Sequence, residues 1–195
     1  REVINSITQE VIENRRWLHK NAELSFKEVD TANYIENKLR EYGYTSIERI
    51  CPTAIVTKLL TGKPGKVIAL RADIDALPLT EKNNLPFASK NPGVMHACGH
   101  DGHTAILLGV AKYMIANKNS ICGEIRFIFQ HAEETPPGGG IELIKAGVMD
   151  GVDEVFGLHL TSVLETGKFG ICYGPLTSFT DSFSILVQGK GGHSS

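Results

Sequence analysis

Several features that mark membrane, secreted or nucleic-acid-binding proteins are missing from this sequence. No apolar stretch approaches the length of a membrane span, and the first residues lack the apolar core of a signal peptide. The 20 basic and 22 acidic residues nearly balance, with no basic run, so nothing favours nucleic acid or a membrane surface as a partner. We therefore expect a cytoplasmic protein.

Cysteine is scarce and scattered. The four cysteines are Cys51, Cys98, Cys122 and Cys172, and no two of them are spaced as C-x-x-C. This spacing indicates neither a disulfide framework nor a zinc-ribbon knuckle. Only Cys98 has other potential metal ligands as close neighbours.

The 195 residues, of which 42% are hydrophobic, suffice for one large domain or for a domain plus part of another. The chain begins with arginine rather than methionine, and it stops directly after an apolar alternating stretch with no helix or capping signal. We therefore expect it to be a fragment of a longer protein.

Residues 96–103 contain three imidazoles, one thiol and one carboxylate around two glycines: His96, Cys98, His100, Asp101 and His103. Thiolate sulfur and imidazole nitrogen are ligands that borderline divalent metals prefer. The alternative is a polar loop whose histidines are merely solvated. The density of ligand groups favours a metal site.

Hydrophobic periodicity predicts three helices. Apolar residues recur at helical spacing over 4–18 and again over 32–42, where Gly43 is a plausible C-terminal stop. A third helix is predicted over 106–115, with Asp101 in the position of an N-cap.

Four short apolar runs predict strands. Residues 54–60 and 66–72 are β-rich and are joined by a five-residue connection that suits a hairpin, and 125–129 is a third strand. Residues 155–158 are predicted to be a buried strand. Strands separated by helices indicate an α/β sandwich with a parallel or mixed sheet.

Candidate ligands follow the predicted strands or lie in the loops after them, where open α/β sheets form their ligand crevice. Asp73 and Asp75 fit either a metal site or a pair of turn aspartates. Adjacent Glu133 and Glu134 are suited to divide the work of a hydrolytic site, one holding an ion and the other moving a proton. His159 is either a ligand or a hydrogen-bonded core histidine.

The remaining histidines are assigned more modest roles. We expect His19 to be structural and leave His131 open. His96 and His103 stay outside the ligand set, because residues flanking two good ligands often act as partners of those ligands.

Five segments carry a family resemblance. They are Met-His-Ala-Cys-Gly-His-Asp-Gly-His-Thr at 95–104, Leu-His-Lys-Asn-Ala-Glu-Leu-Ser-Phe at 18–26, Arg-Ala-Asp-Ile-Asp-Ala-Leu-Pro at 71–78, Phe-Gln-His-Ala-Glu-Glu at 129–134 and Gly-Leu-His at 157–159. The chain resembles the N-terminal half of metallopeptidase family 20, in its hippurate hydrolase and N-acyl-amino-acid amidohydrolase branch.

This resemblance implies a three-layer α/β/α sandwich of the zinc-exopeptidase type. Residues 1–180 would form the N-terminal part of the metal-dependent catalytic domain. Residues 181–195 would form the first strand of an inserted lid and dimerisation domain, at whose start the chain is truncated.

The resemblance further implies that Cys98, His100, Glu134 and His159 hold two divalent metal ions, with one more histidine supplied by a later part of the family's sequence. An imidazole nitrogen has one lone pair and does not readily bridge two ions, so we expect Cys98 and a water to be the bridges. The ligand types suit zinc, nickel or cobalt, and manganese stays open.

By the same resemblance, Glu133 is the general acid/base, Asp75 supports the ligands, and His193 steadies the reacting carbonyl in a partner subunit. The activity implied is hydrolysis of the amide bond of an N-acyl amino acid, or a small peptide, by a metal-bound hydroxide. The full-length protein would be a homodimer through the lid domain. The alternatives are a structural metal-binding module and a catalytically incomplete fragment without turnover.

Overall fold

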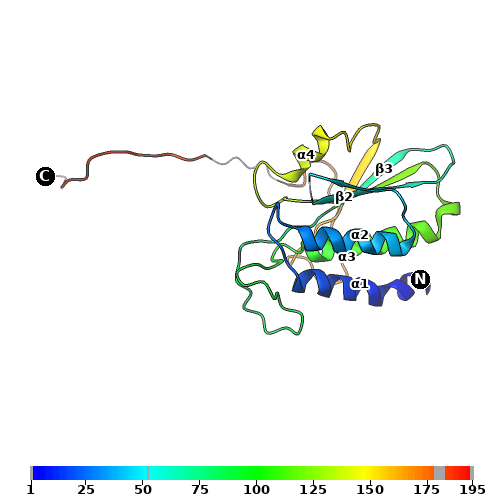
Figure 1. Ribbon diagram of the computed structural model, residues 1–195, viewed down its shortest axis with the longest axis horizontal. Coiled ribbons are helices and arrows are strands. Elements are labelled where there is room, and N and C mark those ends of the chain that lie inside the picture. The colour runs from blue at the N-terminus through cyan, green and yellow to red at the C-terminus, as the bar shows by residue number, and fades with distance from the viewer. Residues whose placement is uncertain (1, 52, 178–182, 194–195) are drawn as a thin grey trace. The chain divides into compact units, whose positions relative to one another are not determined.

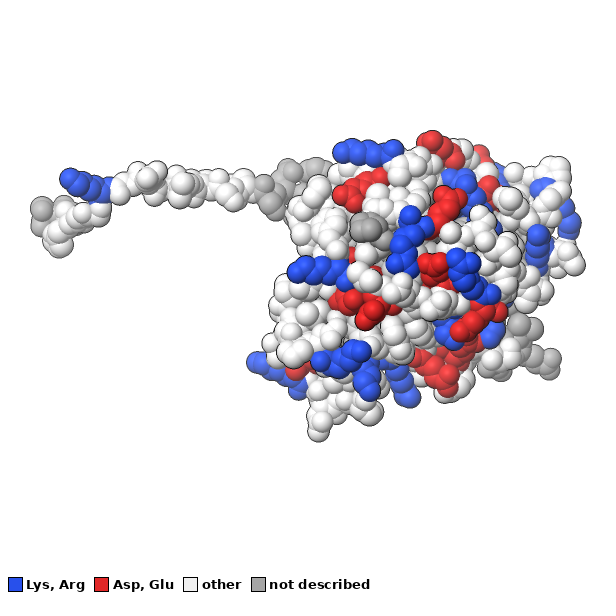
Figure 2. Space-filling model, in the orientation of Figure 1, with Lys and Arg blue, Asp and Glu red and all other residues white. Residues whose placement is uncertain are grey.

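The computed structural model describes residues 2–51, 53–177 and 183–193. The chain divides into two compact units, residues 1–161 and residues 162–195. In the described part of the chain, none of the helices has the length and apolar character needed to cross a membrane. Basic and acidic side chains are interspersed over the face of the molecule that Figure 2 shows.

A five-stranded mixed sheet forms the middle of the first unit. Its order is β1 (Ile47–Ile50), β2 (Ala54–Leu60), β4 (Glu124–Gln130), β3 (Val67–Asp73) and β5 (Glu154–Gly157). The β1–β2 and β2–β4 pairs are antiparallel, and β4–β3 and β3–β5 are parallel.

The predicted hairpin between residues 54–60 and 66–72 is wrong, because β2 and β3 are not paired with each other. β4 lies between β2 and β3, pairing Phe129 with Ile55 on one side and Phe127 with Leu70 on the other. The physical reason is that residues 125–129 of β4 are buried on both faces, which places this strand at the centre of a sheet whose two sides helices cover.

Helices cover both faces of the sheet, as the predicted sandwich requires. Figure 1 shows α2 (Val29–Tyr42) and α3 (His100–Ala116) on one side, with α1 (Glu2–Lys20) stacked beyond them, and α4 (Gly139–Lys145) on the other. A 3₁₀ turn, Lys118–Ser120, follows α3. The three long helices confirm the prediction from periodicity.

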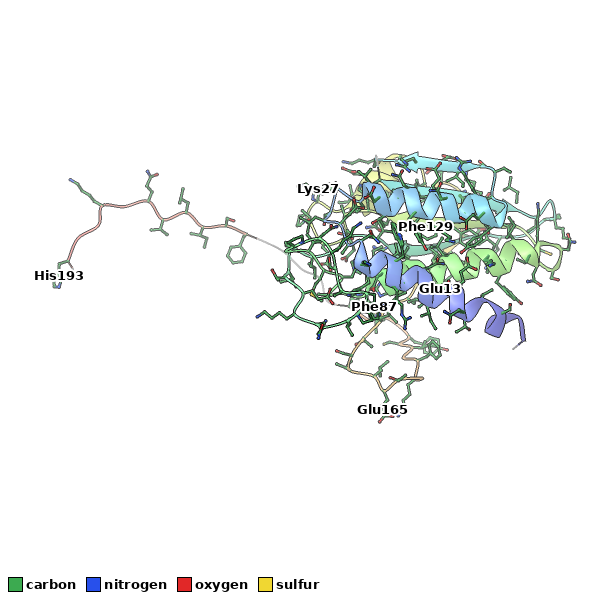
Figure 3. All side chains as sticks on the ribbon, turned by 60° about the horizontal axis from the view of Figure 1, so that its bottom comes forward. Glu13, Lys27, Phe87, Phe129, Glu165 and His193 are labelled. Atoms are coloured by element: carbon green, nitrogen blue, oxygen red, sulfur yellow. The ribbon has the colours of Figure 1, made fainter. Side chains whose placement is uncertain are left out.

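Alternation along the strands divides the core between the two faces. Phe127 and Phe129 of β4, both fully buried, point toward α2 and α3, whereas Ile128 points toward α4. Figure 3 labels Phe129 in the interior of this layer. The larger core therefore lies between the sheet and α2–α3.

Asp101 is not the N-cap of the helix that follows the ligand cluster. Gly99 occupies that position, with a left-handed φ of 91°, and makes no side-chain cap. Asp101 lies in the first turn, where its Oδ2 accepts hydrogen bonds from Arg15 Nε at 2.7 Å and from His19 Nδ1 at 2.8 Å. His19 also hydrogen-bonds Glu81 and is buried, as the expected structural role requires.

The fourth predicted strand exists but is not buried. Val155 and Phe156 of β5 are 53% and 52% exposed. β5 is the edge strand, and the described elements leave most of its side chains in contact with solvent. An apolar run predicts a strand, but it does not show that the other described residues bury the side chains of that strand.

In the second unit, the predicted strand over 181–190 falls partly on residues 181 and 182, which lie outside the described residues. Residues 183–190 are exposed and belong to no strand. The expected boundary between residues 180 and 181 stays a prediction.

The turn before β4 brings two backbone segments close together. Gly123 has a φ of +78°, donates its N–H to Lys63 O, and would place a Cβ 2.1 Å from Lys66 O. We predict that Gly123→Ala destabilises the domain well beyond the matched change Gly62→Ala. Gly62 has a φ of +75°, and no atom lies near the position of an added Cβ. Gly62→Ala should therefore lower the free energy of unfolding only by the about 1–2 kcal/mol that a left-handed conformation costs.

Urea unfolding of both variants measures this difference. The clash at residue 123 should add about 1–3 kcal/mol, the usual cost of overpacking. Equal losses in the two variants would mean that the turn adjusts freely and does not fix the junction of β3 and β4.

Candidate metal centre

Four segments distant in the sequence meet at one edge of the sheet, as the sequence predicted. They are the end of β3, the start of α3, the end of β4 and the segment after β5. His100 Nε2 lies at their centre, 3.7 Å from Asp73 Oδ2, 3.8 Å from Glu133 Oε2 and 3.7 Å from Glu134 Oε1.

A second group of ligand atoms adjoins the first. Cys98 Sγ lies 3.4 Å from His159 Nε2, and these two atoms and a nitrogen of His100 all lie within 4.8 Å of one another. Glu133 and Glu134 form such a group with His100 as well. The two groups share His100, which fits neighbouring cation positions.

The interatomic distances fit a metal centre. Two N, O or S ligands on one tetrahedral ion, each about 2.0–2.3 Å from it, lie roughly 3.3–3.8 Å apart. His100 Nε2 and Glu134 Oε1 are buried, and each lacks a hydrogen-bond partner among the described residues. Because burying an unpaired polar atom costs free energy, this pair of atoms indicates a ligand that binds both.

Asp75 sets the direction of the His100 ring. His100 Nδ1 lies 2.9 Å from the Asp75 backbone oxygen and 3.3 Å from its Oδ1, so Nδ1 carries the hydrogen and Nε2 keeps a free lone pair. Asp75 Oδ2 accepts hydrogen bonds from Ser25 Oγ and from the backbone N–H of Glu134. Burial opposes ionisation of Asp75, but these bonds outweigh it and hold its pKa below the usual range.

His159 is oriented by its backbone neighbour. Its Nδ1 donates to Leu160 O at 2.6 Å, which leaves the Nε2 lone pair facing Cys98. The Leu160 N–H in turn donates to His103 Nε2 at 2.9 Å, and His103 Nδ1 donates to Asp73 Oδ1 at 2.6 Å. Both nitrogens of His103 are therefore engaged, so His103 supports the site and is not itself a ligand in this arrangement.

The centre is rich in acidic groups. Burial and the nearby charge of Glu134 raise the pKa of Glu133 and bring that of the Cys98 thiol to about 12. A divalent cation would reverse both effects, because it neutralises the carboxylates and stabilises the thiolate.

The two adjacent glutamates differ in environment. The Glu134 side chain is 20% exposed and its Oε1 is buried, whereas the Glu133 side chain is 42% exposed. They follow Ala132, which has an unusual φ of +47°. Both carboxylates lie near His100 Nε2, but that of Glu133 is the more exposed of the two.

Sequence reasoning missed several supporting groups. Arg71 donates to Asp73 Oδ2, Ser25 binds Asp75, and the buried Glu28 binds the backbone of Ala132. Ser25 lies in the segment 18–26 that carries the family resemblance, and Glu28 lies just after it. Their closeness to that segment was the signal in the sequence that could have identified them.

Neither His96 nor His193 is a member of these ligand groups. His96 is buried with both ring nitrogens unpaired among the described residues, and burial lowers its pKa to about 4. His193 belongs to residues 162–195, so its catalytic role stays a prediction.

In this α/β/α domain, Cys, His and Glu side chains that could hold a metal ion gather where the parallel strands end. The chain belongs to peptidase family M20/M25/M40, whose family model matches residues 69–188.

Two similar proteins carry hydrolase names. The chain is 52% identical to an N-acyl-L-amino acid amidohydrolase of Geobacillus stearothermophilus, over 99% of this chain and 52% of that protein. It is 49% identical to thermostable carboxypeptidase 2 of Saccharolobus solfataricus, over 98% of this chain and 49% of the relative. The chain thus spans about half the length of these curated relatives.

Solved structures agree on the fold. A putative aminohydrolase from methicillin-resistant Staphylococcus aureus superposes with a TM-score of 0.82 at 48% identity, over 86% of this chain and 43% of that one. A Bacillus subtilis protein described as a dinuclear metal-binding peptidase of the M20 family gives 0.77 at 43% identity, over 80% and 44% of the two chains.

The hydrogen-bonded path through His103 yields a prediction. His103→Phe should weaken metal binding by about 10- to 100-fold, the usual effect of losing a group that orients a ligand, because the Leu160 N–H loses its acceptor and His159 its support. Metal retention against a competing chelator measures this change.

The matched control is Thr104→Val, which removes only a hydrogen bond to the Asp73 backbone oxygen. It should retain metal. If His103→Phe retains metal equally well, His103 does not orient His159.

Proposed function

We propose that the full-length protein is a metal-dependent amidohydrolase that cleaves the amide bond of N-acyl amino acids or of a small peptide. The observation that carries this proposal is the convergence of buried, unpaired His100 Nε2 and Glu134 Oε1 on the group that includes Cys98 and His159. The amidohydrolase and carboxypeptidase names of the relatives support the same reaction class.

In this proposal Cys98, His100, Glu134 and His159 hold two divalent ions, with one further histidine from the rest of the longer chain. Zinc, nickel or cobalt would suit these ligands, and manganese stays open. When bound, such ions polarise the scissile carbonyl and lower the pKa of the attacking water.

Glu133 moves the proton. Its carboxylate is 42% exposed, so a substrate can reach it, and its Oε2 lies 3.8 Å from His100 Nε2 at the proposed site. It takes the proton of the attacking water and returns it to the departing amine nitrogen. Asp75 keeps the His100 ring and the Glu134 backbone in place during this transfer.

The remaining parts of the proposal concern the longer chain. Residues 1–180 contribute to the catalytic domain and residues 181–195 begin a lid and dimerisation domain, through which the protein forms a homodimer. His193 of one subunit steadies the reacting carbonyl in the other. The cytoplasmic location stays a prediction.

Glu133→Gln tests the proposed base. In the full-length protein it should abolish measurable turnover of an N-acyl amino acid while leaving metal content intact, because glutamine keeps the volume but cannot accept the proton. Hydrolysis assays and elemental analysis of the same preparation measure both properties.

The matched variant is Glu134→Gln, one residue further along. It should lose metal as well as turnover. Unchanged turnover in Glu133→Gln would remove Glu133 from its role, and a loss of metal in both variants would show that the two glutamates do not divide the work.

Cys98→Ser tests the thiolate ligand. Metal affinity should fall by more than the about 10- to 100-fold that an orienting partner contributes, because a hydroxyl ionises far less readily than a thiol. Cys122→Ser is the control, since Cys122 is exposed and precedes β4 at the opposite end from Glu133. Equal metal content in the two variants would exclude Cys98 as a ligand.

A further inference from the structure

Glu28 is fully buried, and capping of the helix that follows it, α2, does not account for this burial. It occupies the N-cap position of α2, where Ser, Thr, Asp and Asn are preferred, and its side chain makes no cap hydrogen bond. A buried carboxylate without a local role requires another explanation.

Glu23 caps α2 instead. Its carboxylate accepts hydrogen bonds from the backbone N–H groups of Asp30 and Thr31 and from the Thr31 hydroxyl. The side chain of Glu28 is therefore free to bind elsewhere.

The Glu28 carboxylate joins three separate segments. Oε1 accepts the backbone N–H of Phe26 at 3.0 Å and that of Ala132 at 2.8 Å, and Oε2 accepts the Thr53 hydroxyl at 2.8 Å. These three donors come from the loop before α2, the segment before β2 and the turn after β4.

Both backbone donors belong to strained residues. Phe26 has a φ of +64° and Ala132 a φ of +47°, a left-handed conformation that residues with a Cβ rarely adopt. Such strain persists only where surrounding interactions enforce it. One carboxylate oxygen binds both strained positions, so Glu28 is the group placed to enforce them.

The strained turn leads directly into the proposed metal site. Ala132 precedes Glu133, and the backbone N–H of Glu134 donates to Asp75 Oδ2 at 3.0 Å. Glu133 is thus held between two anchored peptide groups. The Ala132 carbonyl is also fixed, because it accepts the N–H of Gly139.

We propose that Glu28 is a positioning residue, whose buried carboxylate holds Ala132 in the left-handed conformation that directs Glu133 and Glu134 toward His100. This role rests on the proposed function of those two glutamates. Glu28 acts through hydrogen-bond acceptance at a fixed place, so a side chain of equal length with one acceptor oxygen serves the same purpose.

Glu28→Ala and Glu28→Gln in the full-length protein test the proposal. Alanine removes the acceptor of the Ala132 N–H, and the affinity for zinc, measured against a competing chelator, should fall by about 10- to 100-fold. Glutamine keeps Oε1 for the two N–H groups and can donate its amide to the Thr53 hydroxyl, so it should stay within a few-fold of the parent.

A second substitution probes the strain itself. Glycine adopts a positive φ without a Cβ penalty, so in Ala132→Gly the turn does not need the hydrogen bond to Glu28 to keep its conformation. In the double variant Glu28→Ala/Ala132→Gly, zinc affinity should recover by at least severalfold over Glu28→Ala alone. A general loss of stability would not be repaired in this way.

Glu23→Ala is the matched control. It removes a nearby carboxylate that caps α2 and so should lower the melting temperature without changing zinc affinity. If Glu28→Ala behaves like Glu23→Ala, with a lower melting temperature and the parent's zinc affinity, Glu28 is structural only and the proposal fails.

Failure of the proposed function gives a different result. If the parent protein binds no zinc and hydrolyses no N-acyl amino acid, the metal site itself is wrong. If the parent binds zinc and Glu28→Gln loses as much affinity as Glu28→Ala, the metal site stands and the hydrogen-bonding role of Glu28 is overturned.

Discussion

The convergence of acidic groups on one buried imidazole is the constraint on which the rest of the site depends. Asp73, Glu133 and Glu134 all bring a carboxylate oxygen within 4 Å of His100 Nε2, and no described group hydrogen-bonds that nitrogen. Repulsion among carboxylates in a partly buried place disfavours this arrangement unless a cation compensates. The surrounding hydrogen bonds serve to keep the ligand atoms close together despite that repulsion.

The fold supplies the convergence through strand direction. β3, β4 and β5 are parallel, so their carboxyl ends share one edge, and the start of α3 lies at the same edge. A purely antiparallel sheet of the same strands would separate Asp75 from Glu134 by the length of a strand. The position of β4 beside β3 therefore brings the proposed site together and also places the β4 side chains in the core.

The sequence predicted the helices, the sandwich and the convergence of Asp75, Cys98 and Glu134, because periodicity and strand ends are local signals. It failed where the answer depended on a distant partner. The connection after β2 suits a hairpin, but β4, more than 60 residues later, takes the position next to β2. Glu28 was missed for the same reason, since its partner at Ala132 is 104 residues away.

The edge position of β5 has a consequence for how the centre is stabilised. His159 follows a strand that, among the described residues, pairs only with β3, whereas Glu133 and Glu134 follow β4, which pairs with a strand on each side. Any strand added to the outer edge of β5 would restrict His159 and lower the entropy lost when it binds an ion. Coupling between two binding events is reciprocal, so ion binding would then also strengthen the pairing of the added strand with β5.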